Sequence, residues 1–400
     1  MRRVLQFAVL CVSIAAGSAI EPGGGASGTT DRFMTVSTHA AMAMARAQAT
    51  LGDGKNIFRF DTFGDEQSWT DTLGMHNVIE TVSPAAALGL GLKVDGTVLP
   101  PDFLATHSLD SPATTVALLA LDAVVGVKAT VNGGNVESLG VTCALCHSTV
   151  DDSVAPGVGK RLDGWPNVDL DPGKIIALSP NVSATNKMVY NGWGAGKYDP
   201  RFNIDGMNDP VVIPPAFGLA GVALETFTGD GPISYWNSYV AVTQMGGQGV
   251  FIDPRIGVSV VHTPDLVTPK LPDLRSYQLS LATPPPPPGS FDPKAAKRGE
   301  VFFNKVAKCS TCHIPPTYTD INLGIWHEAA ETGMDPDYAE RTATGLYRTT
   351  PLRALWQHPP YFHDGSAATL EDVVDHYVKL LGLHFSRNQR RDLVEFLKTL

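Results

Sequence analysis

The chain has 400 residues, of which 43% are hydrophobic and 18% charged, a composition ordinary for a globular protein of two or three domains. Its 30 Lys and Arg residues against 40 Asp and Glu residues give a formal net charge of −10. Phosphate backbones need a basic face, so this charge argues against a nucleic-acid partner and favours partners that present a basic surface.

The N-terminus has the layout of a secretory signal peptide over residues 1–19. A pair of arginines precedes an apolar run, residues 4–16, and the small residues Ala16-Gly17-Ser18-Ala19 form a cleavage site. The run is shorter than the ~20 residues that span a bilayer, which weighs against the alternative of an uncleaved membrane anchor. We therefore expect a periplasmic or secreted protein without stable membrane insertion.

The next hundred residues contain no recognisable motif. Residues 21–30 are rich in Gly and Ser, so we expect them to be disordered. Further on, the apolar run 114–127 predicts a buried helix. Residues 20–130 are accordingly treated as an N-terminal extension.

The cysteines decide the class of protein. Cys11 lies in the signal, and the other four occur in two identical frames, Cys143-Ala144-Leu145-Cys146-His147 and Cys309-Ser310-Thr311-Cys312-His313. C-x-x-C-H is the attachment site of c-type haem, because two thiols one helical turn apart can add to the vinyl groups of one porphyrin edge while the adjacent His gives the iron its proximal nitrogen. A zinc site or two local disulfides would explain the thiols but not the His after each pair. The sequence thus predicts two covalently bound haem c groups, with His147 and His313 as iron ligands.

The C-terminal part has the clearest periodicity. A polyproline stretch within residues 284–290 is typical of a semi-rigid linker between domains. After it, we predict helices over residues 294–306, over 369–381 with Thr369 as N-cap, and over 387–400 as an amphipathic closing helix.

Several strings in the C-terminal part resemble the bacterial di-haem cytochrome c peroxidases, a family that includes the di-haem enzyme that matures the tryptophylquinone cofactor and the rubber oxygenases. The resemblance is dense over about the last 110 residues, thinner over 147–281, and absent before about residue 130. The matching strings are Arg298-Gly299-Glu300 with Phe302, then Thr349-Thr350-Pro351-Leu352-Arg353, then Pro360-Tyr361-Phe362-His363-Asp364-Gly365-Ser366.

The resemblance implies a mainly α fold with two cytochrome c-like haem domains, many loops and an N-terminal extension. Combined with the motifs, it gives five expected segments: a signal peptide (1–19), an N-terminal extension (20–130), a first cytochrome c-like haem domain (131–283), a Pro-rich linker (284–290) and a second such domain (291–400).

The resemblance also implies a second iron ligand for the C-terminal haem. In the family this ligand is Met in the peroxidases and Tyr in the quinone-maturing enzyme, and here Tyr377 takes its place. A phenolate stabilises ferric iron, so Tyr377 would lower the potential of this haem relative to a Met ligand. The alternative is that Tyr377 is a core aromatic and that His376, His384 or Met334 binds the iron.

By the same resemblance, Trp236 takes the place of a Trp that relays electrons between the two haems, although a plain core role is equally open and Trp193 is a second candidate. The string Asn191-Gly192-Trp193 is similar to the family's H-G-W, so that Asn191 stands where many peroxidases have a removable distal His. The first iron would then be open to a small molecule.

The peroxidases use a Glu about twenty residues after the relay Trp, but no Glu lies between Glu225 and Glu300. Phe251 lies in this stretch and could give an apolar distal pocket like that of the rubber oxygenases, or be ordinary core. Glu225 or Asp253 could supply acid–base chemistry instead. A ligand such as His262 or Met245 would close the first haem.

The leading hypothesis is an oxidoreductase in which one haem transfers electrons and the other activates peroxide or dioxygen. Its partners would be that small-molecule oxidant and a redox partner protein. The alternatives are a non-enzymatic electron-transfer cytochrome and a rubber-oxygenase-like dioxygenase. The family also implies a calcium ion held by backbone carbonyls, at positions that correspond here to His358 and Pro360.

Overall fold

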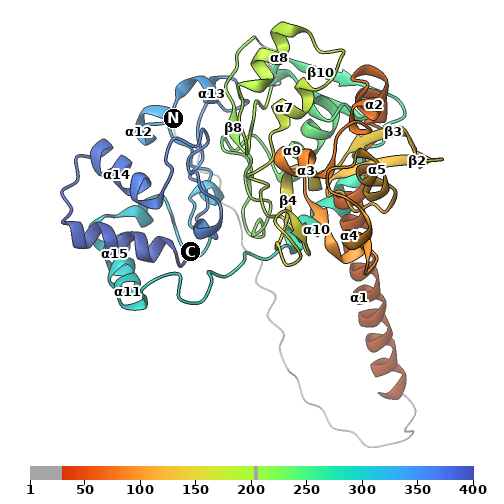
Figure 1. The fold of residues 1–400 in the computed structure, drawn as a ribbon. Helices are drawn as coiled ribbons and strands as arrows, with labels where there is room; N and C mark the ends of the chain where they lie inside the picture. The colour runs from red at the N-terminus through yellow and green to blue at the C-terminus, as the bar shows by residue number, and fades with distance from the viewer. Residues whose placement is uncertain (1–28, 202–205) are drawn as a thin grey trace, which may run out of the picture. The chain divides into compact units, whose positions relative to one another are not determined.

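A computed structural model describes residues 29–201 and 206–400 (Figure 1). The expected signal peptide, with Cys11, lies outside the described residues. The chain divides into two compact units, residues 1–48 and 49–400. The first helix, α1 (Thr29–Phe60), begins inside the stretch that we expected to be disordered, so that prediction is wrong for Thr29 and Thr30. Among the described residues, no helix is both long and apolar enough to cross a membrane.

The fold is mainly helical, which confirms the predicted fold class. Within the described residues the strands form two-stranded sheets only, and only the pair β1 and β5 is parallel. The strands are β1 (Val94–Asp95), β2 (Val127–Asn132), β3 (Asn135–Val141), β4 (Ser148–Val150), β5 (Val158–Gly159), β6 (Arg161–Asp163), β7 (Lys197–Tyr198), β8 (Val211–Val212), β9 (Val250–Asp253) and β10 (Val258–Val261).

Short helices and loops make up most of the remainder. The α-helices are α2 (Met75–Ile79), α3 (Pro84–Gly89), α4 (Phe103–Thr106), α5 (Pro112–Ala120), α6 (Ala144–His147), α7 (Pro172–Ala177), α8 (Ala184–Asn191), α9 (Ile233–Tyr239), α10 (Leu271–Ser280), α11 (Pro293–Val301), α12 (Ala329–Thr332), α13 (Pro336–Glu340), α14 (Leu370–Leu380) and α15 (Arg387–Leu397). Five-residue and six-residue π-helical turns cover Gln67–Thr72, Val240–Gln244 and Phe302–Val306. Single 3₁₀ turns cover Gly96–Val98, Pro254–Ile256, Thr268–Lys270, Cys309–Thr311, Ile321–Leu323 and Leu355–Gln357.

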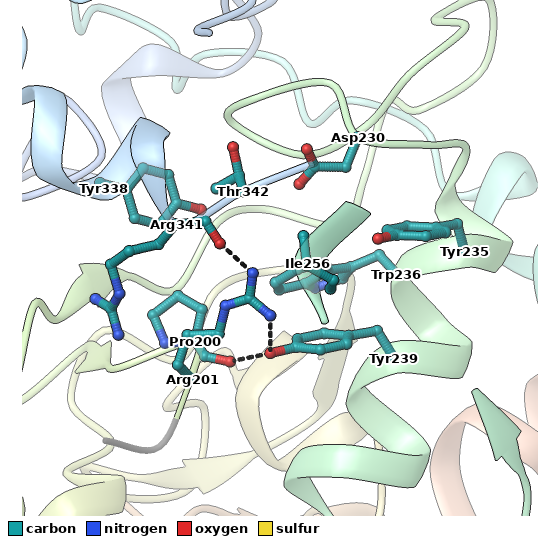
Figure 2. Close-up of a pocket in the computed structure, with 10 residues that line it drawn as sticks. All are labelled: Pro200, Arg201, Asp230, Tyr235, Trp236, Tyr239, Ile256, Tyr338, Arg341 and Thr342. Atoms are coloured by element: carbon teal, nitrogen blue, oxygen red, sulfur yellow. Dashed lines mark hydrogen bonds between the residues drawn. The ribbon is translucent and has the colours of Figure 1, made fainter. Parts of the chain in front are cut away.

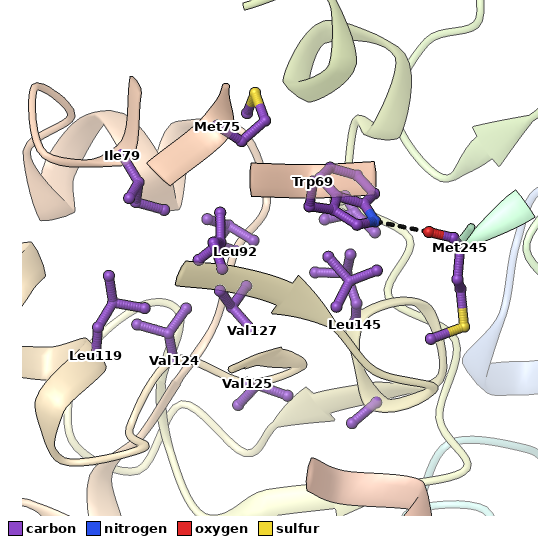
Figure 3. Packing of buried hydrophobic residues seen from close by; sticks show 14 of the residues in the cluster. Trp69, Met75, Ile79, Leu92, Leu119, Val124, Val125, Val127, Leu145 and Met245 are labelled. Carbon is purple, nitrogen blue, oxygen red and sulfur yellow. Dashed lines mark hydrogen bonds between the residues drawn. The ribbon is translucent and has the colours of Figure 1, made fainter. Parts of the chain in front are cut away.

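One large hydrophobic core joins the N-terminal extension to the first attachment motif. Its buried members run from Phe58 to Tyr277 and include Leu145 of the motif itself. Figure 3 shows Trp69 of the first π-helical turn and Val127 of β2 around Leu145, with the indole nitrogen of Trp69 donating to the backbone oxygen of Met245 at 3.0 Å. The extension therefore packs as part of the same core.

The buried helix predicted over residues 114–127 is only partly correct. Helix α5 ends at Ala120, because the next turn places Asp122 and Gly126 at positive φ (53° and 77°), a backbone conformation that a helix cannot continue. Strand β2 then begins at Val127 and pairs with β3. The expected domain boundary between residues 130 and 131 falls inside this hairpin, and the domain division stays a prediction.

Gly126 also fixes the position of the first motif. A Cβ atom at Gly126 would lie 2.1 Å from the backbone nitrogen of Leu145, so only glycine lets the turn approach α6 this closely. Thr142, at the end of β3, donates its amide to the carbonyl of Gly126 (2.9 Å) and accepts from the amide of Leu145 (3.0 Å). The hairpin thus leads directly into the motif helix.

A smaller hydrophobic core belongs to the C-terminal part, where the predicted helices are found. The helix expected over 294–306 is α11 continued by a π-helical turn, and the closing helix is α15. Helix α14 begins with Thr369 as N-cap, as predicted, in a capping box with Asp372. The sequence Arg298-Gly299 explains how α11 crosses α15: Arg298 makes a bidentate ion pair with Asp392 (2.7 and 2.7 Å), and a Cβ at Gly299 would meet the Asp392 carbonyl.

Candidate functional site

The first C-x-x-C-H motif lies on α6, between strands β3 and β4. The His147 amide donates to the Cys143 carbonyl (3.2 Å), which closes the single helical turn that brings both thiols and the imidazole together. The ring atom Nδ1 of His147 lies 3.0 Å from the carbonyl of Pro214. A carbonyl can only accept, so Nδ1 carries the proton and Nε2 keeps a free lone pair.

The second motif repeats this arrangement on a 3₁₀ turn. The His313 amide donates to the Cys309 carbonyl (3.0 Å), and Nδ1 of His313 donates to the carbonyl of Tyr318 (3.0 Å). Burial lowers the pKa of His147 to about 4 and also lowers that of His313. Both imidazoles are therefore neutral near pH 7, the protonation state that a metal ligand requires.

None of the four motif cysteines is in a disulfide. Burial raises the pKa of Cys143 and Cys146 to about 12, that of Cys309 to about 11, and that of Cys312 above its usual range. The four thiols are therefore protonated near pH 7.

A cavity of about 440 Å³ adjoins both motifs, within the ~300–1,000 Å³ typical of cofactor and ligand sites. Its wall contains His147 from the first motif and Cys309, Cys312 and His313 from the second. Most of the other lining side chains are apolar, among them Phe303, whose ring centroid lies 6.4 Å from that of His313.

A half-buried guanidinium in the same wall bears on whether the cavity suits haem, which carries carboxylates on an apolar ring. Arg348 donates from Nε to the carbonyl of Thr226 and from Nη2 to the carbonyl of Glu225 (3.0 Å), while its Nη1 is buried without a partner among the described residues. Such a donor costs about 1–3 kcal/mol unless it is paired, and an ionised carboxylate is its strongest partner. The free Nε2 atoms, the thiols and Arg348 together fit a haem.

Tyr377 lies on α14 and lines the cavity, together with Met334, one of its rivals as iron ligand. Burial raises the pKa of Tyr377 to about 12, so its phenol is neutral unless a cation displaces the proton. His376 is already engaged, because its Nε2 lies 2.8 Å from the carbonyl of Thr332, and neither it nor His384 is among the lining residues. This favours Tyr377 over His376, although the ligand remains a prediction.

Trp236 on α9 lines the cavity and also an adjoining small pocket (Figure 2). In this pocket its ring lies 5.2 Å from that of Tyr239, whose hydroxyl donates to the carbonyl of Pro200 (2.8 Å) and accepts from Arg201. Tyr338 is the other side chain that borders both spaces. Trp236 is therefore placed where a relay could act, while its relay role is untested.

The structure does not bring the other two expected catalytic residues to the cavity. Asn191 is exposed at the end of α8. The neighbouring Trp193 is buried and donates from its indole nitrogen to the side-chain oxygen of Asn208 (2.9 Å). Phe251 is buried on β9 between Tyr235 and Tyr239, at ring distances of 5.3 and 5.2 Å. Both residues lie outside the lining of the cavity.

The two residues considered as closing ligands of the first haem are not cavity residues either. Met245 is part of the large core, and His262 is exposed on the loop after β10. His358 and Pro360, the positions expected to hold calcium by their carbonyls, do border the cavity. Calcium stays a prediction.

The structure places the carboxylate of Glu225 in the cavity wall, which also contains Glu331. Burial raises its pKa to about 7, against the opposing charges of Arg348 and Arg353. From the sequence Glu225 was named only as an alternative source of acid–base chemistry, because it precedes Trp236 whereas the family's spacing puts the Glu after the Trp. Arg348 was missed, because an arginine directly before a matched string carries no signal that it lines a cavity.

Two C-x-x-C-H motifs, each with a neutral, carbonyl-anchored histidine beside one apolar cavity, are the features of c-type haem proteins. No family model matches the chain. It is 34% identical to "Methylamine utilization protein MauG" of Methylorubrum extorquens over 120 residues, 26% of this chain and 34% of the relative. It is 28% identical to "Cytochrome-c peroxidase IdrP1" of Denitromonas iodatirespirans over 149 residues, 26% of this chain and 40% of that protein. The chain is thus related to the di-haem cytochrome c peroxidase and MauG family, which implies c-type haem.

A third relative is "Hydrazine synthase subunit gamma" of Kuenenia stuttgartiensis, 27% identical over 194 residues, 44% of this chain and 46% of the relative. In these alignments the chain therefore spans between a third and a half of the curated relatives' lengths. Among solved structures, hydrazine synthase of the same organism has a TM-score of 0.33 at 21% identity, covering 48% of this chain and 73% of that one. A MauG-like protein associated with microbial copper homeostasis has a TM-score of 0.35 at 17% identity, covering 49% and 75%.

Proposed function

We propose that the protein is an exported di-haem c-type cytochrome oxidoreductase in which one haem transfers electrons and the other activates peroxide or dioxygen. The observation that carries the proposal is the pair of half-buried, neutral histidines, His147 and His313, each anchored through Nδ1 and each beside the same apolar cavity. Its partners would be the small oxidant and a redox partner protein, with the periplasm or the outside of the cell as its location.

Haem, when bound, supplies one-electron redox chemistry and, where its iron has an open position, a site for a small oxidant. The chain's own residues would hold it. The thiols of each motif would attach it, and Arg348 would pair with one of its carboxylates. Tyr377 would bind the second iron as a phenolate, which requires the loss of a proton held with a pKa of about 12. Its proton would therefore leave only because the cation replaces it.

Glu225 favours an enzyme over a pure electron carrier. A general acid–base group works best with a pKa near the operating pH, and Glu225 has a pKa of about 7 beside the cavity. We propose that it takes and returns the protons of the oxidant, in place of the Glu that the stretch 226–299 lacks. A polymer-cleaving dioxygenase has less support, because Phe251 is outside the cavity lining.

The experiment is to produce the full chain with a c-type maturation system and to count haem by pyridine haemochrome absorbance against protein mass. We expect two haems per chain, both retained in denaturing electrophoresis because they are thioether-bound. Peptide mapping should find one haem on the peptide of each motif. A chain that matures with one haem or none, or that binds zinc through the same cysteines, would overturn the proposal.

A further inference from the structure

A carboxylate–imidazole–carboxylate chain lies beside the second attachment motif and has no role in the function proposed above. His327 contacts Glu331 of α12 through Nδ1 (2.9 Å) and Asp320 through Nε2 (2.9 Å). Its backbone is fixed by a two-way pairing with Tyr347 (2.8 and 2.9 Å). Asp320 and His327 place their ligating atoms within 4.8 Å of the sulfur of Cys312, and His327 and Glu331 line the cavity.

The geometry favours the charged form of His327. An ionised carboxylate can only accept and each ring nitrogen faces a carboxylate, so the imidazolium can donate to both, whereas the neutral ring leaves one of these contacts without a proton. Burial by itself lowers the pKa of His327, but the hydrogen bonds of Glu331 and Asp320 outweigh it and leave the pKa above its ordinary 6.5. A proton on Nδ1 is consequently held more tightly here than on a free histidine.

The three side chains also form a gradient from solvent to interior. The exposed fraction falls from 57% for Glu331 to 12% for His327 and 2% for Asp320. At the buried end, the Oδ1 atom of Asp320 has no hydrogen-bond partner among the described residues. A buried carboxylate with one unsatisfied oxygen next to Cys312 is stabilised when His327 carries a positive charge.

We propose that Glu331, His327 and Asp320 form a proton relay that couples reduction at the second attachment motif to uptake of a proton from solvent. This inference rests on the proposed function, since it needs a haem at His313. When a one-electron reductant delivers one electron there, water gives one proton through Glu331 to Nδ1 of His327. The imidazole becomes the imidazolium, and the local charge is unchanged.

Few other ionisable groups face His327. Besides Asp320 and Glu331 they are Cys312 and His313, since Tyr347 offers only its backbone and turns its hydroxyl to the carbonyl of Asp335 (2.6 Å). With haem attached, Cys312 is a thioether and His313 a ligand, so neither exchanges a proton. The coupled titration near this motif then belongs to His327 and its two carboxylates.

The test uses the full-length protein with both haems attached. Midpoint potentials are measured by spectroelectrochemistry from about pH 6 to about pH 9, and proton uptake on reduction by dithionite is followed with an indicator dye. At pH values above the pKa of His327, which lies above its ordinary 6.5, we expect the second haem's potential to fall with a slope that approaches ~59 mV per pH unit, the tenfold change of a one-proton, one-electron couple. Below the pKa of His327 the ring is already charged, so the slope should vanish.

His327→Gln and Glu331→Gln should each remove most of this slope and of the proton uptake. Glu328→Gln is the matched control, because Glu328 is an exposed acid on the same segment, and it should behave as wild type. Should His327→Gln fail to fold, Glu331→Gln still tests the relay from an exposed position. Unchanged slope and uptake in Glu331→Gln, with two haems counted, would overturn the relay while leaving the proposed function intact.

Discussion

The two attachment motifs have the same five-residue frame but lie in different surroundings. The first is embedded in the large core, whose members start at Phe58 and end at Tyr277, and Gly126 presses against its helix. The second borders a small core built from Phe303 and the helices α14 and α15. A motif can thus be read from the sequence alone, while the strength with which the fold holds it depends on residues far away in the chain.

The ionisable groups of the two motifs also differ in their pKa values. Burial raises the pKa of both thiols of the first motif to about 12, and lowers that of its histidine to about 4. In the second motif only Cys309 has a comparably raised pKa, of about 11. The second motif instead has the charged neighbours Asp320, His327 and Glu331. We infer that the first site is tuned by exclusion of water and the second by charge.

The largest contrast should come from removing each pair of thiols. Cys309→Ser with Cys312→Ser should leave a folded protein with one haem on the first motif. Cys143→Ser with Cys146→Ser should remove the other haem and also lower the yield of folded protein, because a polar hydroxyl replaces partly buried sulfur that packs against the large core. Haem content and the yield of soluble protein measure this. Equal yields from the two double variants would contradict the difference in embedding.

Single core truncations should sharpen the comparison. Phe58→Ala and Phe303→Ala each remove an aromatic ring that is at most 2% exposed and leave a cavity in its place, so each should lower the free energy of unfolding by about 3–5 kcal/mol. Denaturant unfolding followed by haem absorption should show that, in Phe303→Ala, the iron of the second haem loses its protein ligands first, while the haem stays covalently attached. A single shared transition in both variants would mean that the two cores unfold as one.

A pH series tests the large core by itself. Burial raises the pKa of Asp65 to about 9, although the amide of Val141 donates to its carboxyl (3.2 Å). The folded state then binds a proton that the unfolded state has lost above pH 3.8. Stability should accordingly fall as pH rises from about 4 to about 9, by up to ~1.4 kcal/mol per pH unit. Asp65→Asn should flatten this slope in denaturant unfolding, and a slope as steep as that of wild type would refute the assignment.

The smallest effect on stability should come from Tyr377→Phe, which removes one hydroxyl from the cavity wall. If Tyr377 binds the second iron, the variant should raise the potential of that haem and change its absorption spectrum while unfolding almost as wild type does. His376→Asn is the control, because His376 bonds to a backbone carbonyl instead. A variant Tyr377→Phe with an unaltered spectrum would return the ligand role to Met334.

The sequence predicted the parts of the fold that depend on local signals. Thr369 is a helix N-cap by its residue type, and the apolar spacing after it gives α14 directly. Both C-x-x-C-H motifs are local as well. The resemblance to the peroxidases added a prediction that the motifs do not make, namely Tyr377 as an iron ligand, and Tyr377 does line the cavity.

What the sequence could not predict depends on contacts between distant residues. The end of α5 follows from a turn that packs against α6, and the run 114–127 holds no local signal for it beyond one glycine. Asn191 and Phe251 were assigned by spacing to a family pattern across a stretch where this chain departs from it, so neither reaches the cavity. Arg348, Glu225 and His327 have surface-like residue types, and only the tertiary structure shows that the cavity surrounds them.

The most direct test of the account is a low-temperature electron paramagnetic resonance spectrum of the ferric protein with both haems attached. We predict a low-spin signal from the second haem, for which His313 and Tyr377 would be the protein ligands, beside a high-spin signal from the first, for which His147 would be the only one. Addition of a small anion should convert the high-spin signal alone. Two low-spin signals, in both the oxidised and the half-reduced protein, would contradict an open first iron and assign the protein to electron transfer.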